Sequence, residues 1–590
     1  MADVLYRKVD YTLKKLVEDI DMGEIGLPEI QRPFVWPTSK VRDLFDSMYR
    51  GYPIGYLLLW ENGYPGEHRS IGANRKQKVP HLLIVDGQQR LTSLYAVIKA
   101  VSVIGKDFRP RPIRIAFQPI KKKFEVTNPA IEKDPEWIAD ISELWKPETN
   151  AFTFINGFLD RLKKGHEVSE DKGKDLANAI ARLENLLDYP LTALEVSSSV
   201  DEDRVAEIFV RINSKGTPLN QADFILTLMS VFWDEGRAKL EEFCRWARTP
   251  PADKHPSPFN HYLRPNPDQL LRVSVALGFR RARLEHVYSL LRGKDLQTRQ
   301  FSVEQRERQF VVLREAQAYA LDLQNWHEFF KVLTRAGFPS AQIISSQMAV
   351  LYSYALWLIG KRDFCVDTYR LREVMARWFF MAALTGRYTS SPESRMDQDL
   401  ALLRGVNTAG AFVEVLDQQI DAALTRDYWE VTLPNNLETA AARNTGQFAY
   451  YAALRLLDAR VLYSKMKVAD LLDPTIQAKK TAVERHHLFP RKYLQQMGIR
   501  EERAINQVAN YALVEWSDNI AISDQPPRDY VPELEKRFTS VELQLMCAWH
   551  ALPDGWYEMD YSTFLKERRK RIAQVIRRGF EKLKEEMTES

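Results

Sequence analysis

The sequence predicts a helix-rich, multidomain α+β protein. A mixed α/β domain comes first, a mainly α-helical region fills the middle, and a further domain ends the chain. A chain of 590 residues is too long for one hydrophobic core. Short apolar runs of strand length mark residues 56–60, 82–85 and 113–117. After a proline-rich stretch at residues 250–267, apolar residues recur at helical spacing to about Leu472.

These patterns predict three domains, over residues 1–250, 251–455 and 456–590. In the first domain, Thr38 is expected to cap a helix that Gly51 ends. The apolar face of this helix consists of Val41, Leu44, Phe45 and Met48. Helices are expected to return after about residue 135. The central region carries no motif that indicates chemistry, so its apolar residues are interpreted as core and the region as a helical scaffold.

The composition indicates a soluble globular protein, because 45% of the residues are hydrophobic and 27% are charged. The net charge of only +4 means that any surface that binds nucleic acid must be local. Each basic run could equally be a solvated face. The candidate runs are Lys121 to Lys123, the cluster of Arg485, Arg491 and Lys492, and the run Lys566, Arg568, Arg569, Lys570 and Arg571.

The three cysteines, Cys244, Cys365 and Cys547, lie far apart and lack the spacing of a structural zinc site. Disulfides are therefore not expected. The N-terminus has no signal-peptide pattern, and the apolar stretch at residues 343–359 carries polar residues that favour a buried helix over a membrane span. These observations predict a cytoplasmic protein with no membrane partner.

A strand-to-helix turn with the sequence Asp-Gly-Gln-Gln-Arg follows the second apolar run, at residues 86–90. Backbone N–H groups at such a helix start favour a phosphate. Gly87 lets the backbone approach that phosphate, and Arg90 can pair with its charge. The turn therefore predicts a site for a nucleotide or nucleic-acid phosphate, although an ordinary capped turn would have the same pattern.

A pair of histidines, His486 and His487, stands near the other end of the chain, with Glu484 just before it. Asparagines follow at positions 506, 510 and 519. A one-metal nuclease of the HNH type needs such a set. One imidazole takes a proton from water, and a second side chain holds a divalent ion that stabilises the leaving oxygen. The alternative is a hydrogen-bonded polar pair with no catalytic role.

The last helix of the chain is predicted to have one apolar side and one basic side. The apolar side would pack on the C-terminal domain, and the basic side could also follow a DNA backbone. The apolar residues are Ile572, Val575, Ile576, Phe580 and Leu583.

Several blocks of the sequence resemble GmrSD-type restriction enzymes, a modification-dependent (type IV) family whose relatives include BrxU and SspE. The resemblance covers both ends of the chain well and the middle poorly. At the N-terminal end the blocks are residues 28–36 (Pro-Glu-Ile-Gln-Arg-Pro-Phe-Val-Trp), 55–60 (Gly-Tyr-Leu-Leu-Leu-Trp), 86–90 and 209–220. At the C-terminal end they are residues 486–490 (His-His-Leu-Phe-Pro), 510–514 (Asn-Tyr-Ala-Leu-Val) and 519–523 (Asn-Ile-Ala-Ile-Ser).

For the N-terminal half, the resemblance implies a fold similar to ParB and sulfiredoxin that binds and hydrolyses a nucleoside triphosphate. Asp86 and Arg90 would be catalytic. Arg211 and Asn213 could equally form a turn before a helix, and Gln31 and Arg32 a helix-packing corner. The implied nucleotide-binding residues are Asp86, Gly87, Gln88, Gln89, Arg90, Thr92, Gln31, Arg32, Arg211 and Asn213.

For the C-terminal half, the resemblance implies a ββα-metal (HNH, His-Me finger) nuclease. His487 would be the general base, and Asn510 would orient the loop and the base. His486 and Asn519 would hold Mg²⁺ or Mn²⁺, with Glu484 at or near the metal.

The resulting hypothesis is a single-chain endonuclease that cuts modified double-stranded phage DNA and depends on a nucleotide. Dimerisation would be a natural way to cut both strands. Two alternatives stay open. One is a phosphorothioate-sensing relative similar to SspE, in which the modification stimulates nucleotide hydrolysis and the nuclease nicks. The other is a nucleotide-switched DNA-binding factor with a residual nuclease.

Overall fold

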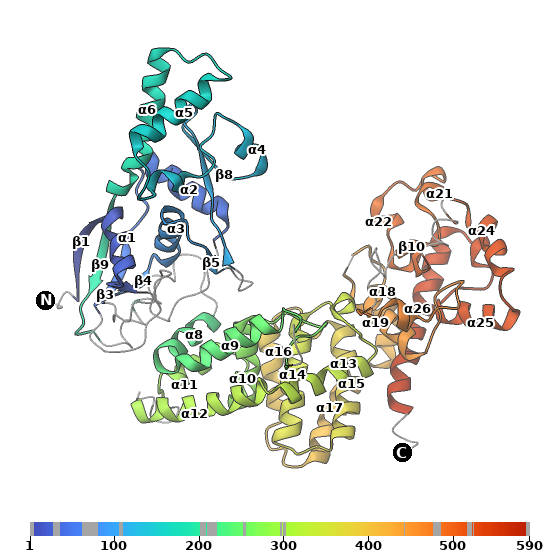
Figure 1. The fold of residues 1–590 in the computed structure, drawn as a ribbon. Helices are drawn as coiled ribbons and strands as arrows, with labels where there is room; N and C mark the ends of the chain where they lie inside the picture. Colours follow the sequence, from blue (N-terminus) through green and yellow to red (C-terminus); the bar gives the residue numbers. More distant parts are fainter. Residues whose placement is uncertain are drawn as a thin grey trace. The chain divides into compact units, whose positions relative to one another are not determined.

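The computed structural model divides the chain into two compact units, residues 1–238 and 239–590 (Figure 1). The division into three domains stays a prediction. The structure describes residues 5–26, 36–61, 81–104, 110–200, 208, 221–251, 255–295, 298, 302–441, 443–475, 485–515, 522 and 524–585.

A mixed five-stranded sheet forms the centre of the first unit, in the order β1-β9-β3-β4-β2. β1 pairs antiparallel with β9, β9 parallel with β3, β3 antiparallel with β4, and β4 parallel with β2. The N-terminal mixed α/β fold predicted from the sequence is therefore confirmed. The strands are β1 (Tyr6–Thr12), β2 (Ile25–Gly26), β3 (Leu57–Glu61), β4 (Leu82–Asp86) and β9 (Pro190–Val196).

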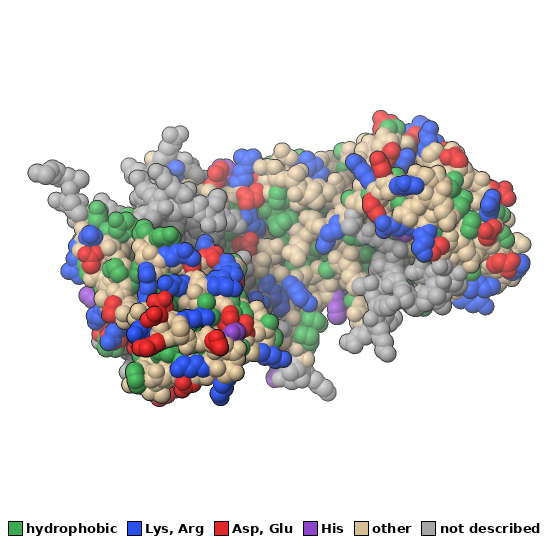
Figure 2. All heavy atoms as spheres, turned by 90° about the horizontal axis from the view of Figure 1, so that it is seen from above, with side chains coloured by type: hydrophobic (Ala, Val, Ile, Leu, Met, Phe, Trp, Pro, Cys, Tyr) green, Lys and Arg blue, Asp and Glu red, His purple; other side chains and the backbone are tan. Residues whose placement is uncertain are grey.

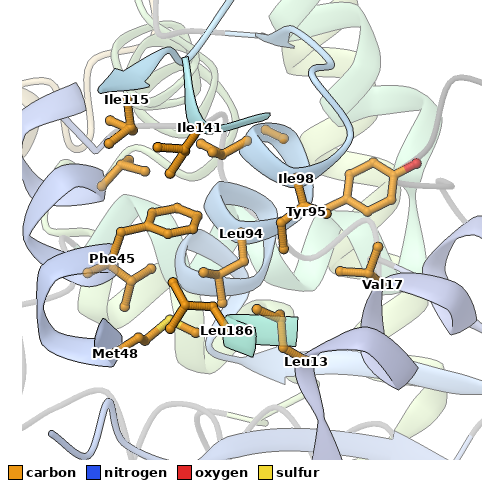
Figure 3. Close-up of a cluster of buried hydrophobic side chains, with 14 of the residues drawn as sticks. Leu13, Val17, Phe45, Met48, Leu94, Tyr95, Ile98, Ile115, Ile141 and Leu186 are labelled. Atoms are coloured by element: carbon orange, nitrogen blue, oxygen red, sulfur yellow. The ribbon is translucent and has the colours of Figure 1, made fainter. Parts of the chain in front are cut away.

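Both faces of the central strands are buried, which explains why β3 and β4 are continuous apolar runs. Successive side chains of a strand point to opposite faces. In β4, Leu82 and Ile84 face the main core, whereas Leu83 and Val85 face a smaller cluster on the other side. Figure 3 shows the main core, in which side chains of α1, α2 and α3 converge.

Several helices and the small hairpins of this unit contribute side chains to the main core, which contains no described residue of α8 or α9. The α-helices are α1 (Leu13–Met22), α2 (Thr38–Tyr49), α3 (Gln88–Ile98), α4 (Pro129–Lys133), α5 (Ala151–Lys163), α6 (Glu170–Glu184) and α8 (Gln221–Phe232), with 3₁₀ turns at Ile141–Trp145 and Asn185–Asp188; α9 (Asp234–Trp246) crosses the boundary into the second unit. Two hairpins are formed by β5 (Val103–Ile104) with β6 (Pro110–Arg111), and by β7 (Ile115–Gln118) with β8 (Lys123–Val126).

Most predicted elements of this unit are confirmed, with two corrections. The predicted strands and the helix with Val41, Leu44, Phe45 and Met48 on its buried face are present. However, Thr38 is the first residue of α2, and its N-cap is Pro37, which makes no side-chain cap. The strands β1 and β9 were not predicted. They are joined through a long-range antiparallel register, and β1 is largely exposed, so neither has a strong local signal.

The described part of the second unit consists mainly of helices, so the predicted helical middle is confirmed. The predicted buried helix at residues 343–359 is α14, whose residues Ala349 to Gly360 are all buried. Up to residue 456 the α-helices are α10 (Pro267–Phe279), α11 (Leu284–Leu291), α12 (Val303–Ala320), α13 (Leu323–Arg335), α14 (Gln347–Arg362), α15 (Thr368–Thr385), α16 (Pro392–Leu402), α17 (Ala409–Ala423), α18 (Leu433–Asn436) and α19 (Thr445–Leu456), with short turns at Ala341–Ile343 and Tyr428–Thr432.

The C-terminal segment places one short antiparallel strand pair among helices. β10 (Arg485–His487) pairs with β11 (Tyr511–Leu513). The HNH fold predicted for this segment stays a prediction. The helices are α20 (Val468–Leu471), α21 (Arg491–Gln496), α22 (Glu502–Ile505), α24 (Pro527–Glu535), α25 (Ser540–Trp549) and α26 (Tyr561–Glu585), with 3₁₀ turns at Val508–Asn510 and Trp556–Glu558.

The last helix, α26, buries the apolar face predicted from the sequence. Its first half contacts the C-terminal segment, where the Phe564 ring lies 4.9 Å from the Phe489 ring. Its second half packs on the middle helices, since the Phe580 ring lies 5.6 Å from the Phe380 ring. The helix therefore joins the C-terminal segment to the helical scaffold and does not pack on the C-terminal segment alone.

All three cysteines are free, as predicted. No described helix is both long enough and apolar enough to cross a membrane.

We predict that Gly579→Ala destabilises the second unit, because α26 and α19 cross closely at this glycine. A Cβ atom there would lie 2.5 Å from the Cβ of Ala453 and 2.7 Å from its Cα. Overpacking of this kind costs about 1–3 kcal/mol of unfolding free energy. Chemical denaturation measures this loss. The control is Gly410→Ala in α17, where no atom lies within 4 Å of the new methyl group. Equal stability of the two variants would contradict the prediction.

Candidate functional site

The predicted phosphate turn of the first unit lies between β4 and α3, as expected. Gly87 is the N-cap of α3 with φ of 95°, a left-handed conformation that favours glycine. The N-cap residue Gly87 makes no side-chain cap, and the first turn of α3 carries no acidic side chain. The dipole of α3 therefore favours an anion at this end of the helix.

Arg90 braces the loop before β3. Its guanidinium donates to the carbonyl oxygens of Ile54 at 2.5 Å and Tyr56 at 2.7 Å, and to Asp86 Oδ2 at 3.4 Å. Burial lowers the pKa of Arg90, and the negative charge of Asp86 opposes that shift. Much of the guanidinium is thus engaged with protein oxygens. Pairing of Arg90 with a phosphate stays a prediction.

The structure brings only part of the predicted nucleotide-binding set together. Gln88, Gln89, Arg90 and Thr92 lie in the first turns of α3, directly after Asp86 and Gly87. The Asp86 side chain is 31% exposed and so accessible from solvent. The remaining predicted residues, Gln31, Arg32, Arg211 and Asn213, lie outside the described residues.

The His487 side chain lies on β10, opposite Tyr511 of β11. Its Nε2 atom is 2.9 Å from Asn506 Oδ1, and its ring lies 4.6 Å from the Tyr511 ring. Burial lowers the pKa of His487, the hydrogen bond to Asn506 Oδ1 raises it, and the nearby Arg491 charge lowers it. The lowered pKa leaves the imidazole neutral at physiological pH, the form that can accept a proton.

A polar chain continues from Asn506 towards solvent. Asn506 Nδ2 donates to Glu502 Oε2 at 3.0 Å, and the Tyr511 hydroxyl donates to Asn506 Oδ1 at 3.1 Å. Glu502 forms an ion pair with Arg491. The sequence pattern includes Asn506 without a role and does not single out Glu502 or Tyr511. The four-residue spacing of Glu502 and Asn506 is the one local signal for their contact.

Asn510 is fully buried, with 0% of its surface exposed, and it fixes the loop after β10. Its Oδ1 accepts from the Phe489 N–H at 2.9 Å. Its Nδ2 donates to the carbonyl oxygens of Phe489 and Ile505, both at 3.1 Å. Asn510 therefore binds the backbone of this loop, and its predicted role in orienting the loop and the base stays a prediction. Among the described hydrogen bonds, however, the side chain that contacts His487 is Asn506.

Of the three predicted metal ligands, only His486 is described, because Glu484 and Asn519 lie outside the described residues. His486 is 4% exposed, and its ring meets the Tyr530 ring edge-on at 6.5 Å. The described residues alone contain no cluster of three or more His, Cys, Asp or Glu side chains arranged for a metal ion. An imidazole, an amide and a carboxylate would nevertheless form a donor set of nitrogen and oxygen atoms that suits Mn²⁺ and tolerates Mg²⁺.

Arg568 of α26 binds the backbone on both sides of Asn510. It is 0% exposed and donates to the carbonyl oxygens of Ala509 at 2.7 Å and Tyr511 at 2.8 Å, on either side of Asn510. It also donates twice to the His550 carbonyl oxygen, at 3.2 and 3.1 Å. Burial lowers the pKa of Arg568. The prediction that Arg568 belongs to a DNA-facing basic run is therefore wrong, because a fully buried guanidinium cannot reach a phosphate.

The other predicted basic runs are at least partly exposed but share their surface with acids. Arg491 pairs with Glu502, Lys492 with Asp524, and Lys123 with Glu125. On the face shown in Figure 2, Lys and Arg side chains lie among Asp and Glu side chains in both units. This mixture agrees with the small net charge of the chain.

Comparison with known proteins links the first unit to a family. Residues 13–230 match the family model described as the GmrSD restriction endonuclease, N-terminal domain. The match supports a GmrSD-type N-terminal domain in this chain, and the family suggests a restriction endonuclease that binds DNA and acts in defence. An uncharacterized protein of Methanocaldococcus jannaschii is 22% identical over 554 residues, which cover 88% of this chain and 86% of that protein. This similarity extends well beyond the matched domain.

We predict that Arg568→Leu destabilises the second unit by more than about 3 kcal/mol, because it leaves several buried carbonyl groups without donors. Chemical denaturation measures the loss. The control Arg571→Leu removes an exposed arginine from the same helix and should change stability by less than about 0.5 kcal/mol. An unchanged stability of Arg568→Leu, with weaker and less salt-dependent DNA binding, would instead identify Arg568 as a phosphate contact.

Proposed function

We propose that this protein is a nucleotide-dependent endonuclease that cuts modified double-stranded DNA in anti-phage defence. The observation that carries the proposal is the arrangement of His487. A half-buried imidazole with a lowered pKa is held by Asn506, next to the loop that the buried Asn510 fixes. This is how a general base is prepared for water activation. The match of residues 13–230 to a restriction endonuclease domain supports the same class of activity.

In the proposed cleavage step, His487 takes a proton from a water molecule whose oxygen attacks the scissile phosphorus. The bond from phosphorus to the leaving oxygen then breaks, and that oxygen takes up a proton from solvent water. His486, together with Glu484 and Asn519, would hold Mg²⁺ or Mn²⁺, which would supply positive charge to the leaving oxygen. Asn510 would keep the loop that follows His487 in one conformation throughout, because its three described side-chain hydrogen bonds are with the backbone.

The first unit would bind and hydrolyse a nucleoside triphosphate at the start of α3. The dipole of α3 favours the phosphate chain at this helix start, and Gly87 provides the close backbone approach. Asp86 lies beside this helix start with an accessible carboxylate, which can bind the nucleotide's metal ion or orient water. Arg90 would act partly through the loop that it braces. Gln88, Gln89 and Thr92, with Gln31, Arg32, Arg211 and Asn213, would complete the site.

We predict that His487→Ala lowers the cleavage rate by at least about 10²–10⁴-fold, the usual contribution of a general base, and leaves DNA affinity unchanged. The substrates are phage DNA with glucosylated hydroxymethylcytosine, unmodified DNA and phosphorothioate DNA. Each is incubated with Mg²⁺ or Mn²⁺, with and without nucleotide.

Cleavage of one modified substrate that is lost in His487→Ala would establish both the nuclease and its target. Phosphorothioate DNA that stimulates nucleotide hydrolysis and is nicked would favour the SspE-like alternative. No cleavage of any substrate, with hydrolysis intact, would favour the nucleotide-switched DNA-binding factor. A His487→Ala protein that cuts at the wild-type rate would contradict the assignment of His487 as the general base.

We predict that Asp86→Asn abolishes nucleotide turnover with little loss of stability, because the amide has the shape of the carboxylate but not its charge. Turnover is measured as phosphate release. The matched control is Asp46→Asn on α2, whose carboxylate pairs with Arg50 on the surface and should leave turnover unchanged. Wild-type turnover in Asp86→Asn would refute the role of Asp86.

A further inference from the structure

We infer that Asn506 is a positioning residue, which holds the His487 imidazole with its proton on Nε2 and leaves Nδ1 as the atom that accepts the proton from water. The inference rests on the proposed nuclease function. It assigns the reacting nitrogen and a residue that selects it.

The hydrogen bonds of the Asn506 amide fix its orientation. One end of the amide faces Glu502 Oε2 at 3.0 Å. An ionised carboxylate has only acceptors, so the amide NH₂ group must point to it. The amide oxygen then points the other way, towards Tyr511 and His487, where it receives the tyrosine hydroxyl at 3.1 Å. The hydrogen-bond network, and not the shape of the amide, therefore decides which end faces the histidine.

The orientation of the Asn506 amide in turn selects the tautomer of His487. A neutral imidazole carries one N–H donor and one acceptor nitrogen. Asn506 Oδ1 is an acceptor, and it lies 2.9 Å from His487 Nε2. Nε2 must therefore carry the proton, and Nδ1 keeps the lone pair. A general base needs that lone pair on the nitrogen that faces the water.

The Tyr511 ring restricts the orientation of the His487 imidazole. Tyr511 is the cross-strand partner of His487, and the two rings lie 4.6 Å apart at an angle of 39°. The same tyrosine donates to Asn506. The β10–β11 register thus places the ring contact and the acceptor together. A hydrogen bond at one nitrogen and a ring contact on one side leave the imidazole little freedom to rotate.

Glu502 holds the Asn506 amide in place. Glu502 pairs with Arg491, and both side chains are more than half exposed. An exposed ion pair adds little stability by itself. Its effect here is directional, because Arg491 binds one oxygen of the Glu502 carboxylate and leaves the other turned towards Asn506. The hydrogen bonds that link Arg491, Glu502, Asn506 and His487 therefore fix the orientation of the imidazole and do not transfer protons.

Without Asn506, both tautomers of His487 are populated and the ring can turn. Loss of such an orienting partner costs about 10- to 100-fold in activity. We expect Asn506→Ala to lower the maximal cleavage rate by that factor, with unchanged DNA affinity and unchanged Michaelis constant. Asn506→Asp keeps an oxygen that accepts from Nε2–H but loses the contact with Glu502, so it should restore part of the rate.

Two readouts separate positioning from a general structural role. The first is the comparison of Asn506→Ala with Asn444→Ala, a helix-cap asparagine in the same unit that accepts from the Gln447 N–H at 2.9 Å. Both variants lose a hydrogen-bonding amide, and only the first should lose cleavage. The second readout is the ¹⁵N spectrum of histidine-labelled protein above pH 8, assigned with His487→Ala. The wild type and Asn506→Asp should show the Nε2–H form of His487, and Asn506→Ala a mixture of tautomers.

The inference is overturned if the wild type shows the Nδ1–H form, or if Asn506→Ala cuts at the wild-type rate while His487→Ala is inactive. If His487→Ala also cuts normally, the proposed function fails instead. The ¹⁵N readout does not depend on cleavage, so it decides the tautomer even if no DNA substrate is cut.

Discussion

The buried amide of Asn510 is the interaction on which the C-terminal site depends. Its three hydrogen bonds close the chain from Phe489 to Ile505 and so hold the loop between the paired strands β10 and β11. An unsatisfied buried polar group costs about 1–3 kcal/mol, so loss of this amide would expose several such costs at once. The register that sets His487 opposite Tyr511, and the turn that brings Asn506 to the imidazole, both follow from this closed loop.

At each candidate site an arginine donates hydrogen bonds to several backbone carbonyl groups. Arg90 holds the carbonyls of Ile54 and Tyr56, and Arg568 holds those of Ala509, Tyr511 and His550. A guanidinium has five donors in a fixed plane, so it can satisfy several carbonyl groups that no shorter side chain could reach together. A basic residue beside a catalytic motif can therefore stabilise the shape of the site without touching a phosphate.

The predicted elements that the structure confirms are those with a strong local pattern. The apolar run of β4 and the Asp-Gly dipeptide after it indicated a strand, a turn and a helix start, and all three are present. The buried helix α14 was equally clear. The strands β1 and β9 were missed because they are defined by their pairing with each other. That pairing joins residues almost two hundred positions apart, and no local window of sequence contains it.

The sequence by itself determined which residue types meet at each site, because the motifs at residues 86–90 and 486–490 are local and their chemistry follows from their side chains. Only the tertiary structure decided which partner each of those side chains binds and which of them are buried. Asn506 and Asn510 stand four residues apart, and the local sequence does not show which of them contacts the imidazole. The path of the chain turns Asn506 towards His487 and buries Asn510 against the backbone. Likewise, α26 carries several basic residues of similar character, and packing alone placed Arg568 inside the protein. Burial and hydrogen-bond partners depend on contacts between distant segments, so they emerge only when the chain is folded.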